Sequence, residues 1–384
     1  MLHKTIRLDP VEKRPEFDAL RREVRAFLAE VGQERDLSRT NWSSFDPEFS
    51  RLCGQRGYIG MTWPKRYGGR DASPIQKYVV NEELIAGGAP LGAHWVADRQ
   101  SGTQILRHAT AEVREDILPR IVRGECYFGI GMSEPGSGSD LASVQMKARR
   151  GEGGWVLSGR KLWTTNAHRV HYLIALARTS PATEKDRRAG LSQFIVGMSS
   201  PGLEVRPVYD LVGNHEFNEL TFDDVFVPDS HMLGGEGDGW KLVTGELAFE
   251  RSGPDRYLSN AQLLLGAADR LSSDASASDV AGLGRLIAHL ASLRRMSGSV
   301  AGMLDRGLMP NAEAALVKDV GTRFEQEVPE VVRKMLSASR RRGEDDAEFE
   351  ALTREMILTA PCYTIRGGTT EILRGIIARD LGLR

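Results

Sequence analysis

Apolar residues follow two different spacings along this chain and divide it into three segments. Over residues 10–125 they recur three and four positions apart, the spacing of one helix face, as in Phe17, Leu20, Val24, Phe27 and Leu28. Between 126 and 231 the apolar runs are short and rich in strand-forming residues, and Gly-Gly, Ser-Gly, Pro-Gly and Pro-Asp turns separate them. From residue 239 the helical spacing returns.

These patterns predict an α+β multidomain fold in three parts. We expect an N-terminal helical domain over 1–125, a β-sandwich or barrel domain over 126–231, and a C-terminal helical bundle over 232–384. Pro254 follows Ser252 and Gly253, so the first helix of the bundle should kink there. The polar stretches 272–279 and 340–346 are expected to be solvated loops. The predicted bundle helices are 240–265, 280–304, 312–339, 347–360 and 371–381.

The composition narrows the class of protein. The 384 residues carry 51 basic and 52 acidic side chains, a net charge of -1 that gives no reason to expect nucleic acid or an anionic membrane as partner. Apolar runs fall short of the roughly 20 residues that span a bilayer, and residues 1–10 lack the apolar core of a secretory signal. Cys53, Cys126 and Cys362 are far apart, which favours a reduced, cytoplasmic compartment.

Two histidine-containing pairs have simpler interpretations than a functional site. His168 and His171 lack the further ligands that a metal site needs, so we expect no metal. His94 and Trp95 are interpreted as an ordinary core pair, because both residue types are commonly part-buried.

Three motifs stand apart from these general patterns. They are Gly-Ile-Gly-Met-Ser-Glu-Pro-Gly-Ser-Gly-Ser-Asp over 129–140, Lys-Leu-Trp-Thr-Thr-Asn over 161–166, and Arg-Gly-Gly-Thr-Thr-Glu over 366–371. The first two resemble, at similar spacing, the flavin-binding signatures of the acyl-CoA dehydrogenase family, and 201–203 and 222–228 match that family as well. The order of helices, strands and helices is also the family's order, so the resemblance covers essentially the whole chain.

The resemblance implies FAD and a set of residues that bind it. In the first loop, backbone and hydroxyl groups would meet the flavin and the phosphates of the acyl-CoA, Trp163 would form a wall against the isoalloxazine, and Thr165 would lie near N5. Glycines and hydroxyls before the last helix leave N–H groups free for an anion. The alternatives are a surface turn, a core tryptophan and an ordinary helix cap. The implied cofactor residues are Met132, Ser133, Gly138, Ser139, Trp163, Thr165, Thr369 and Glu371.

The catalytic base is expected in an unusual place. Many family members carry a Glu directly before the last Gly-Thr, but this chain has Gly367 there. A minority place it on the first helix of the C-terminal domain as Glu followed by Arg, which matches Glu250 and Arg251. Val243, Leu247, Pro254 and Tyr257 would share a helix face with Glu250, and an apolar face should raise the pKa of that carboxyl group. The alternative is a solvated Glu250. Gly367 keeps its N–H, which in the family binds the thioester oxygen.

Two family elements are missing, which leaves more than one function open. We find no Arg-x-x-Phe-Gly near 281–286 and no Gly-Gly-Asn-Gly between 349 and 360. The leading prediction is FAD-dependent α,β-dehydrogenation of an acyl-CoA to the trans-2-enoyl-CoA, with electrons passing to an electron-transfer flavoprotein. The chain would act as a homo-oligomer or with a second dehydrogenase chain. The alternatives are a non-catalytic or half-site partner subunit, and a flavin-dependent monooxygenase on the same fold. Straight, branched and polycyclic acyl groups stay open, as does a carrier-protein thioester.

Overall fold

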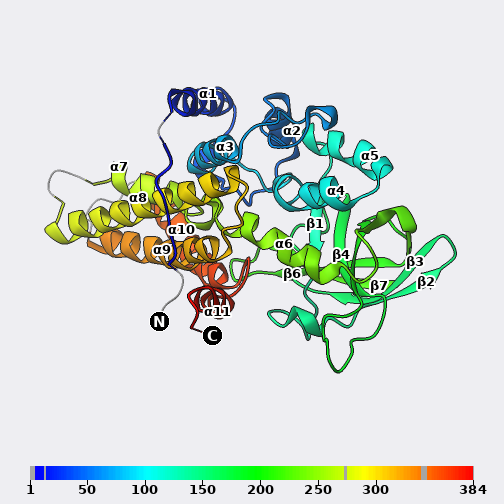
Figure 1. The fold of residues 1–384 in the computed structure, drawn as a ribbon. Helices are drawn as coiled ribbons and strands as arrows, with labels where there is room; N and C mark the ends of the chain where they lie inside the picture. The colour runs from blue at the N-terminus through cyan, green and yellow to red at the C-terminus, as the bar shows by residue number, and fades with distance from the viewer. Residues whose placement is uncertain (1–4, 13, 272–274, 339–343, 384) are drawn as a thin grey trace. The chain divides into compact units, whose positions relative to one another are not determined.

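The computed structural model of the chain describes residues 5–12, 14–271, 275–338 and 344–383, without the side chains of 246–250, 337–338 and 344–345 (Figure 1). The chain forms two compact units, each built from separate segments. The first contains Met1–Ser44, Ser73–Pro90 and Ala248–Arg384, and the second contains Phe45–Ala72 and Leu91–Leu247. The three-part division at 125 and 231 stays a prediction.

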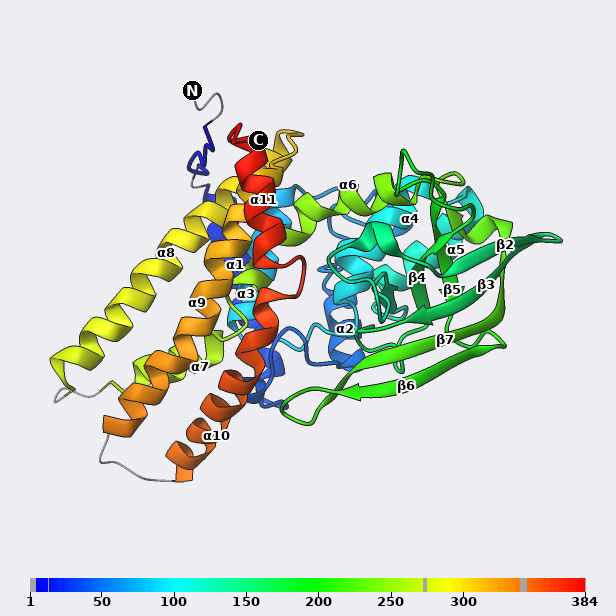
Figure 2. The same ribbon diagram turned by 90° about the horizontal axis from the view of Figure 1, so that it is seen from below.

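The first unit is a helical bundle in which α8, α9 and α11 lie side by side (Figures 1 and 2). Phe17 of α1, Val79 of α3 and Ala301 of α8 share one buried cluster. Val300 and Val317 form part of another between α8 and α9. The helices of this unit are α1 (Pro15–Val31), α3 (Pro74–Ala86), α7 (Ala261–Asp269), α8 (Ala277–Asp305), α9 (Asn311–Ala338), α10 (Glu344–Thr359) and α11 (Thr370–Asp380).

The second unit combines helices with one eight-stranded sheet, visible in Figure 2. Its strand order is β6-β7-β3-β2-β4-β5-β8, with β1 parallel to β4. The strands are β1 (Phe128–Gly131), β2 (Lys147–Gly151), β3 (Gly154–Lys161), β4 (Tyr172–Arg178), β5 (Leu191–Gly197), β6 (Leu203–Tyr209), β7 (His215–Pro228) and β8 (Met232–Leu233). The helices are α2 (Pro47–Gln55), α4 (Gly102–His108) and α5 (Ala111–Val122), and α6 (Gly239–Arg251) continues from this unit into the first.

The sheet folds over on itself around an apolar core. Trp155 of β3 and Phe194 of β5 have ring centroids 5.8 Å apart, although two strands separate β3 from β5 in the sheet. In a flat sheet that separation is about 14 Å, three strand spacings. The strong curvature explains how one sheet encloses the core that the sequence predicted for a sandwich or barrel. The α+β fold with helical N- and C-terminal parts is therefore confirmed.

One predicted helix is wrong. Instead of a kinked helix over 240–265, α6 ends at Arg251 and α7 starts at Ala261. Gly253, before the proline, is extended, and Pro254 opens a short 3-10 turn. The Ser297 hydroxyl of α8 donates to the carbonyl of Ser252 at this break. Pro254 and Tyr257 therefore do not share a helix face with Glu250. They give no reason to expect a raised pKa for its carboxyl group.

The other predicted helices of the bundle begin and end within three residues of the observed ones. The apolar runs at 155–157, 172–177, 193–196 and 225–227 lie in β3, β4, β5 and β7, whereas β1, β2, β6 and β8 were not predicted. In β2 the side chains of Lys147, Arg149 and Arg150 are exposed, so this strand carries little apolar signal. None of the helices in the described ranges is long and apolar enough to cross a membrane.

Candidate functional site

A buried ion pair joins the first two motifs in the second unit. Lys161, at the end of β3, places Nζ 2.9 Å from Oε1 of Glu134 and donates to the carbonyl of Met132 at 3.0 Å. Next to it, the Leu162 N–H donates to the carbonyl of Ser133 at 3.0 Å. Lys161 is fully buried and Glu134 nearly so. The loop with Met132 and Ser133 is therefore tied directly to the segment that carries Trp163.

Glu134 also organises its own loop. Its carboxylate accepts the N–H groups of Gln145 at 2.7 Å and Met146 at 2.9 Å, while its backbone pairs with Ser137. Burial lowers the pKa of Lys161 from 10.5 to about 8, against the opposing effect of Glu134. Lys161 is thus mostly charged at neutral pH. The sequence analysis missed this pair, because a lysine after a strand and a glutamate in a turn are ordinary residues until the fold joins them.

Trp163 is a surface residue, so the core alternative for it is wrong. Its side chain is 56% exposed and meets the ring of Phe217 edge-on, with centroids 5.9 Å apart. Its backbone has a φ of 64°, in the left-handed region that non-glycine residues rarely adopt. Thr165 is half-buried in the same turn. Strained backbone of this kind clusters at functional sites, which agrees with a ligand-contacting role for the exposed Trp163.

The rest of the first loop is open. Gly138 and Ser139 are exposed, and a Cβ added at Gly138 would meet nothing within 4 Å. The structure thus brings Met132 and Ser133 to the Trp163 segment and leaves Gly138 and Ser139 at the surface of their own turn. These residues fit a flavin, which needs an aromatic wall and polar loop groups beside it.

The third motif belongs to the first unit, where Arg251 meets Gly367. Arg251 is buried, and its Nε donates to the Gly367 carbonyl at 3.3 Å. Gly367 and Gly368 have φ values of 67° and 98°, and a Cβ at Gly368 would lie 3.2 Å from Nη2 of Arg251. The backbone conformation at 368 therefore favours glycine, and a Cβ there would also push on the Arg251 guanidinium.

Thr369 and Glu371 form the start of α11. Thr369 is the N-cap, and its hydroxyl accepts the N–H of Ile372 at 3.4 Å. The Glu371 backbone N–H, followed by the Thr369 hydroxyl, lowers the pKa of the exposed Glu371 carboxyl group. The ordinary-cap interpretation of this segment is correct, and it is compatible with a cofactor contact, which stays a prediction.

Arg366 anchors the same loop on its other side. Its Nη2 donates to Glu325 at 2.8 Å, to the Ser259 hydroxyl at 2.7 Å and to the Asp255 carbonyl at 3.1 Å. Its guanidinium also lies over the ring of Trp42, 5.2 Å from the centroid, and 4.3 Å from the centroid of Tyr363. The residue before Gly367 is therefore fixed by charge, hydrogen bonds and two aromatic rings.

Glu250, the predicted base, lies in the last turn of α6, but its side chain is outside the described residues. Its role stays a prediction. The structure places its neighbour Arg251 against Gly367. The catalytic role of Arg251 stays a prediction as well.

The histidines for which no functional site was expected, His94, His168 and His171, have structural partners. The Tyr127 N–H donates to Nδ1 of His171 at 3.0 Å, and His168 stacks on His215. Within the described residues no cluster of three metal-ligating side chains is found. His94 is buried and bonded to the Ser50 hydroxyl at 2.8 Å, and Trp95 is buried beside it, so the core-pair interpretation is correct.

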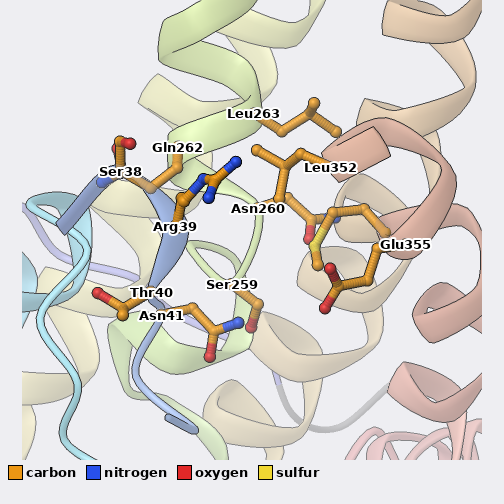
Figure 3. Close-up of a pocket in the computed structure, with 11 residues that line it drawn as sticks. Ser38, Arg39, Thr40, Asn41, Ser259, Asn260, Gln262, Leu263, Leu352 and Glu355 are labelled. Carbon is orange, nitrogen blue, oxygen red and sulfur yellow. The ribbon is translucent and has the colours of Figure 1, made fainter. Parts of the chain in front are cut away.

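A small cavity in the first unit is not a cofactor site. Figure 3 shows its lining, which comes from the loop with Asn41, from Ser259 and Asn260, and from Glu355 of α10. Its volume of about 20 Å³ holds a water molecule or two.

Comparison with known proteins gives one family over the whole chain. Models of the N-terminal, middle and C-terminal domains of acyl-CoA dehydrogenases match residues 14–125, 129–225 and 237–382. The chain belongs to the acyl-CoA dehydrogenase family, whose members depend on FAD.

Two relatives from Mycobacterium tuberculosis illustrate the range of similarity. The acyl-CoA dehydrogenase FadE34 is 34% identical over 96% of this chain, and the match covers 49% of FadE34, so the chain spans about half the length of that relative. The acyl-CoA dehydrogenase IpdE1 is 32% identical over 85% of both chains.

Solved structures show the same architecture. The Tcur3481-Tcur3483 steroid ACAD has a TM-score of 0.84 at 26% identity, covering 97% of this chain and 98% of the compared chain. The ChsE4-ChsE5 complex from Mycobacterium tuberculosis has a TM-score of 0.84 at 27% identity, covering 98% and 100%. The name of each of these two structures joins two different proteins.

We predict that Lys161→Met lowers the free energy of unfolding by about 3–5 kcal/mol, because it leaves the Glu134 carboxylate buried without its cation. Adding Glu134→Gln should restore part of the loss. Urea denaturation of the single and double variants measures both effects. The control is Lys147→Met, which removes an exposed lysine from β2 and should change stability by less than about 0.5 kcal/mol. If Lys161→Met and Lys147→Met lowered the free energy of unfolding by the same amount, the buried pair would not be important for stability.

We predict that Arg366→Lys lowers the free energy of unfolding by about 1–3 kcal/mol, because an ammonium cannot reproduce the planar contacts of the guanidinium. Arg374→Lys on α11 is the matched control. Arg374 is about half exposed and lies 3.4 Å from Asp319, so its replacement should cost less than about 1 kcal/mol. Thermal or urea unfolding of both variants checks the difference, and a tolerant Arg366 would show that its contacts add little.

Proposed function

We propose that this chain oxidises an acyl-CoA thioester between Cα and Cβ to the trans-2-enoyl-CoA with FAD as the bound cofactor. The proposal rests on the bonds of Lys161 to Glu134 and Met132, which join the first two motifs. They hold the segment with the exposed Trp163 beside the loop with Met132 and Ser133. Family membership supports the same reaction class.

When bound, FAD would supply the acceptor for the hydride that leaves Cβ of the substrate. The first motif would bind the cofactor and the substrate phosphates through Met132, Ser133, Gly138 and Ser139. The second would hold the flavin ring through Trp163 and Thr165. Thr369 and Glu371, at the start of α11, would contact the cofactor as well. The N-terminal end of a helix suits a polar or anionic group.

The proton from Cα requires a carboxylate, and Glu250 is our candidate for this base. A positioned general base typically contributes about 10²–10⁴-fold to the rate. Gly367 has no side chain to offer, but its N–H can donate to the thioester oxygen as negative charge develops there. The hydrogen bond from Arg251 to the Gly367 carbonyl supports this role, since it restrains the loop that carries the N–H.

For the substrate we favour a bulky, polycyclic acyl group. One solved structure with the same fold and 26% identity is titled a steroid ACAD. We propose an electron-transfer flavoprotein as the acceptor of the electrons. The cytoplasmic location stays a prediction from the cysteine content. An anaerobic panel of straight, branched and steroid-derived acyl-CoA thioesters, scored by bleaching of the flavin absorbance, identifies the acyl class.

A second candidate is a half-site partner of another dehydrogenase chain. The absent Arg-x-x-Phe-Gly and Gly-Gly-Asn-Gly elements favour it, and the two structural relatives are complexes of two chains. The visible spectrum of the chain purified alone decides between them. We expect flavin absorbance after reconstitution with FAD. A colourless protein that takes up FAD only when mixed with a companion dehydrogenase chain would establish the half-site function instead.

We predict that Glu250→Gln abolishes dehydrogenation, with a loss of at least about 10²-fold in turnover, and retains bound flavin. The amide keeps the size of the side chain and cannot accept the proton. Stopped-flow flavin reduction by acyl-CoA measures the loss, and the visible spectrum measures flavin retention. Glu246→Gln, one turn earlier on α6, tests the assignment. Activity lost in Glu246→Gln and kept in Glu250→Gln would move the base to Glu246.

A further inference from the structure

The turn that carries Trp163 is strained at both ends. Trp163 and Asn166 have φ values of 64° and 54°, in the left-handed region where side chains with a Cβ are disfavoured. Such a conformation persists when surrounding contacts determine it. The contacts of this turn therefore decide where Trp163 and Thr165 point.

Asn218, a single buried residue, holds Thr164, which lies between Trp163 and Thr165, through both its backbone and its side chain. The Thr164 N–H donates to the carbonyl of Asn218 on β7 at 3.1 Å, and Nδ2 of Asn218 donates back to the Thr164 carbonyl at 3.0 Å. Asn218 is fully buried. A third bond, from the Asn166 N–H to the Glu216 carbonyl at 2.8 Å, ties the end of the turn to the same strand.

Two stacked histidines fix the orientation of the Asn218 carboxamide. His215 Nε2 lies 2.8 Å and His168 Nδ1 lies 3.2 Å from Oδ1 of Asn218, and the two imidazole rings stack with centroids 3.7 Å apart and planes 13° apart. An amide oxygen only accepts hydrogen bonds, so the proton must sit on Nδ1 of His168 and on Nε2 of His215. With Oδ1 engaged by both rings, Nδ2 is left facing Thr164.

These bonds link the Trp163 turn to β7 at two points. His168 follows Thr164 in the same turn, whereas His215 and Asn218 belong to β7. Asn218 therefore holds the turn at Thr164 through its amide nitrogen and at His168 through its oxygen. Partial burial lowers the pKa of His168, and the neighbouring His215 lowers it further. The imidazole of His168 is therefore neutral near pH 7.

We propose that Asn218, oriented by His168 and His215, is a positioning residue for the flavin-contacting turn. It fixes Trp163 and Thr165 without touching the cofactor itself. The inference rests on the proposed function, because it takes these two residues as flavin contacts. No sequence pattern indicated this role, since neither histidine nor Asn218 lies in one of the three motifs.

Asn218→Asp tests the proposal with an almost isosteric change. A carboxylate has no N–H to donate to the Thr164 carbonyl, so the turn loses one of its bonds while the size of the side chain is kept. Asn214→Asp is the matched control, because Asn214 is exposed in the loop between β6 and β7 and undergoes the same chemical change.

The readouts are chosen to separate positioning from folding. An indole against the flavin quenches its fluorescence, so we expect the fluorescence of FAD bound to Asn218→Asp to rise several-fold. We also expect flavin reduction by substrate to slow by about 10- to 100-fold with substrate affinity changed by less than about threefold, because misplacement of reacting groups acts on the rate. The Asn214→Asp protein should match the wild type in both measurements.

The outcomes distinguish the two levels of the argument. Wild-type protein that takes up no FAD, alone or with a companion chain, overturns the proposed function and this inference with it. An Asn218→Asp protein with bound FAD and wild-type fluorescence and reduction rate overturns the positioning role alone. If Asn218→Asp does not fold, His215→Ala decides, since it removes one bond to Oδ1 and leaves both Thr164 bonds in place. A rise in flavin fluorescence supports the proposal, and unchanged fluorescence overturns it.

Discussion

The buried ion pair between Lys161 and Glu134 is the constraint on which the candidate flavin site depends. A fully buried ammonium is costly unless its charge and its protons are satisfied, and here one carboxylate and the Met132 carbonyl satisfy them. The same carboxylate holds two backbone N–H groups of the segment before β2. Three separate stretches of chain thus meet at one pair of charges, which fixes the loop and the Trp163 segment together.

The C-terminal loop follows the same principle with arginines. Arg251 reaches the Gly367 carbonyl, and Arg366 is held by Glu325, Ser259 and two aromatic rings. Glycines at 367 and 368 permit the left-handed backbone, but they do not select it, because glycine is free to adopt many conformations. The charged side chains around the loop make that selection. In both units, therefore, flexible motif residues are positioned by less conspicuous charged neighbours.

The replacement of a glutamate by Gly367 changes what the C-terminal loop can contribute. It leaves a backbone donor where many family members have a carboxylate, so the proposed reaction would need a proton acceptor from another element, for which Glu250 is our candidate. The break after Arg251 ends α6 directly after Glu250, and the hydrogen bond from Ser297 to the Ser252 carbonyl fixes that end of the helix. A helix end that is held on both sides suits a catalytic group, because its position is determined by packing rather than by the loop that follows.

The sequence by itself determined the three-part order of helices, strands and helices, because helical apolar spacing and short strand-forming runs between turns reflect local geometry that each segment carries alone. It also gave candidate site residues such as Ser133, Trp163, Arg251 and Gly367, because their motifs resemble those of the acyl-CoA dehydrogenase family. Only the tertiary structure decided that α6 stops at Arg251, that Lys161 meets Glu134, and that Asn218 lies between two stacked histidines. These contacts join residues far apart in the sequence. Their energies come from burial and from the exact pairing of charges and hydrogen-bonding groups, which no local pattern of residues records.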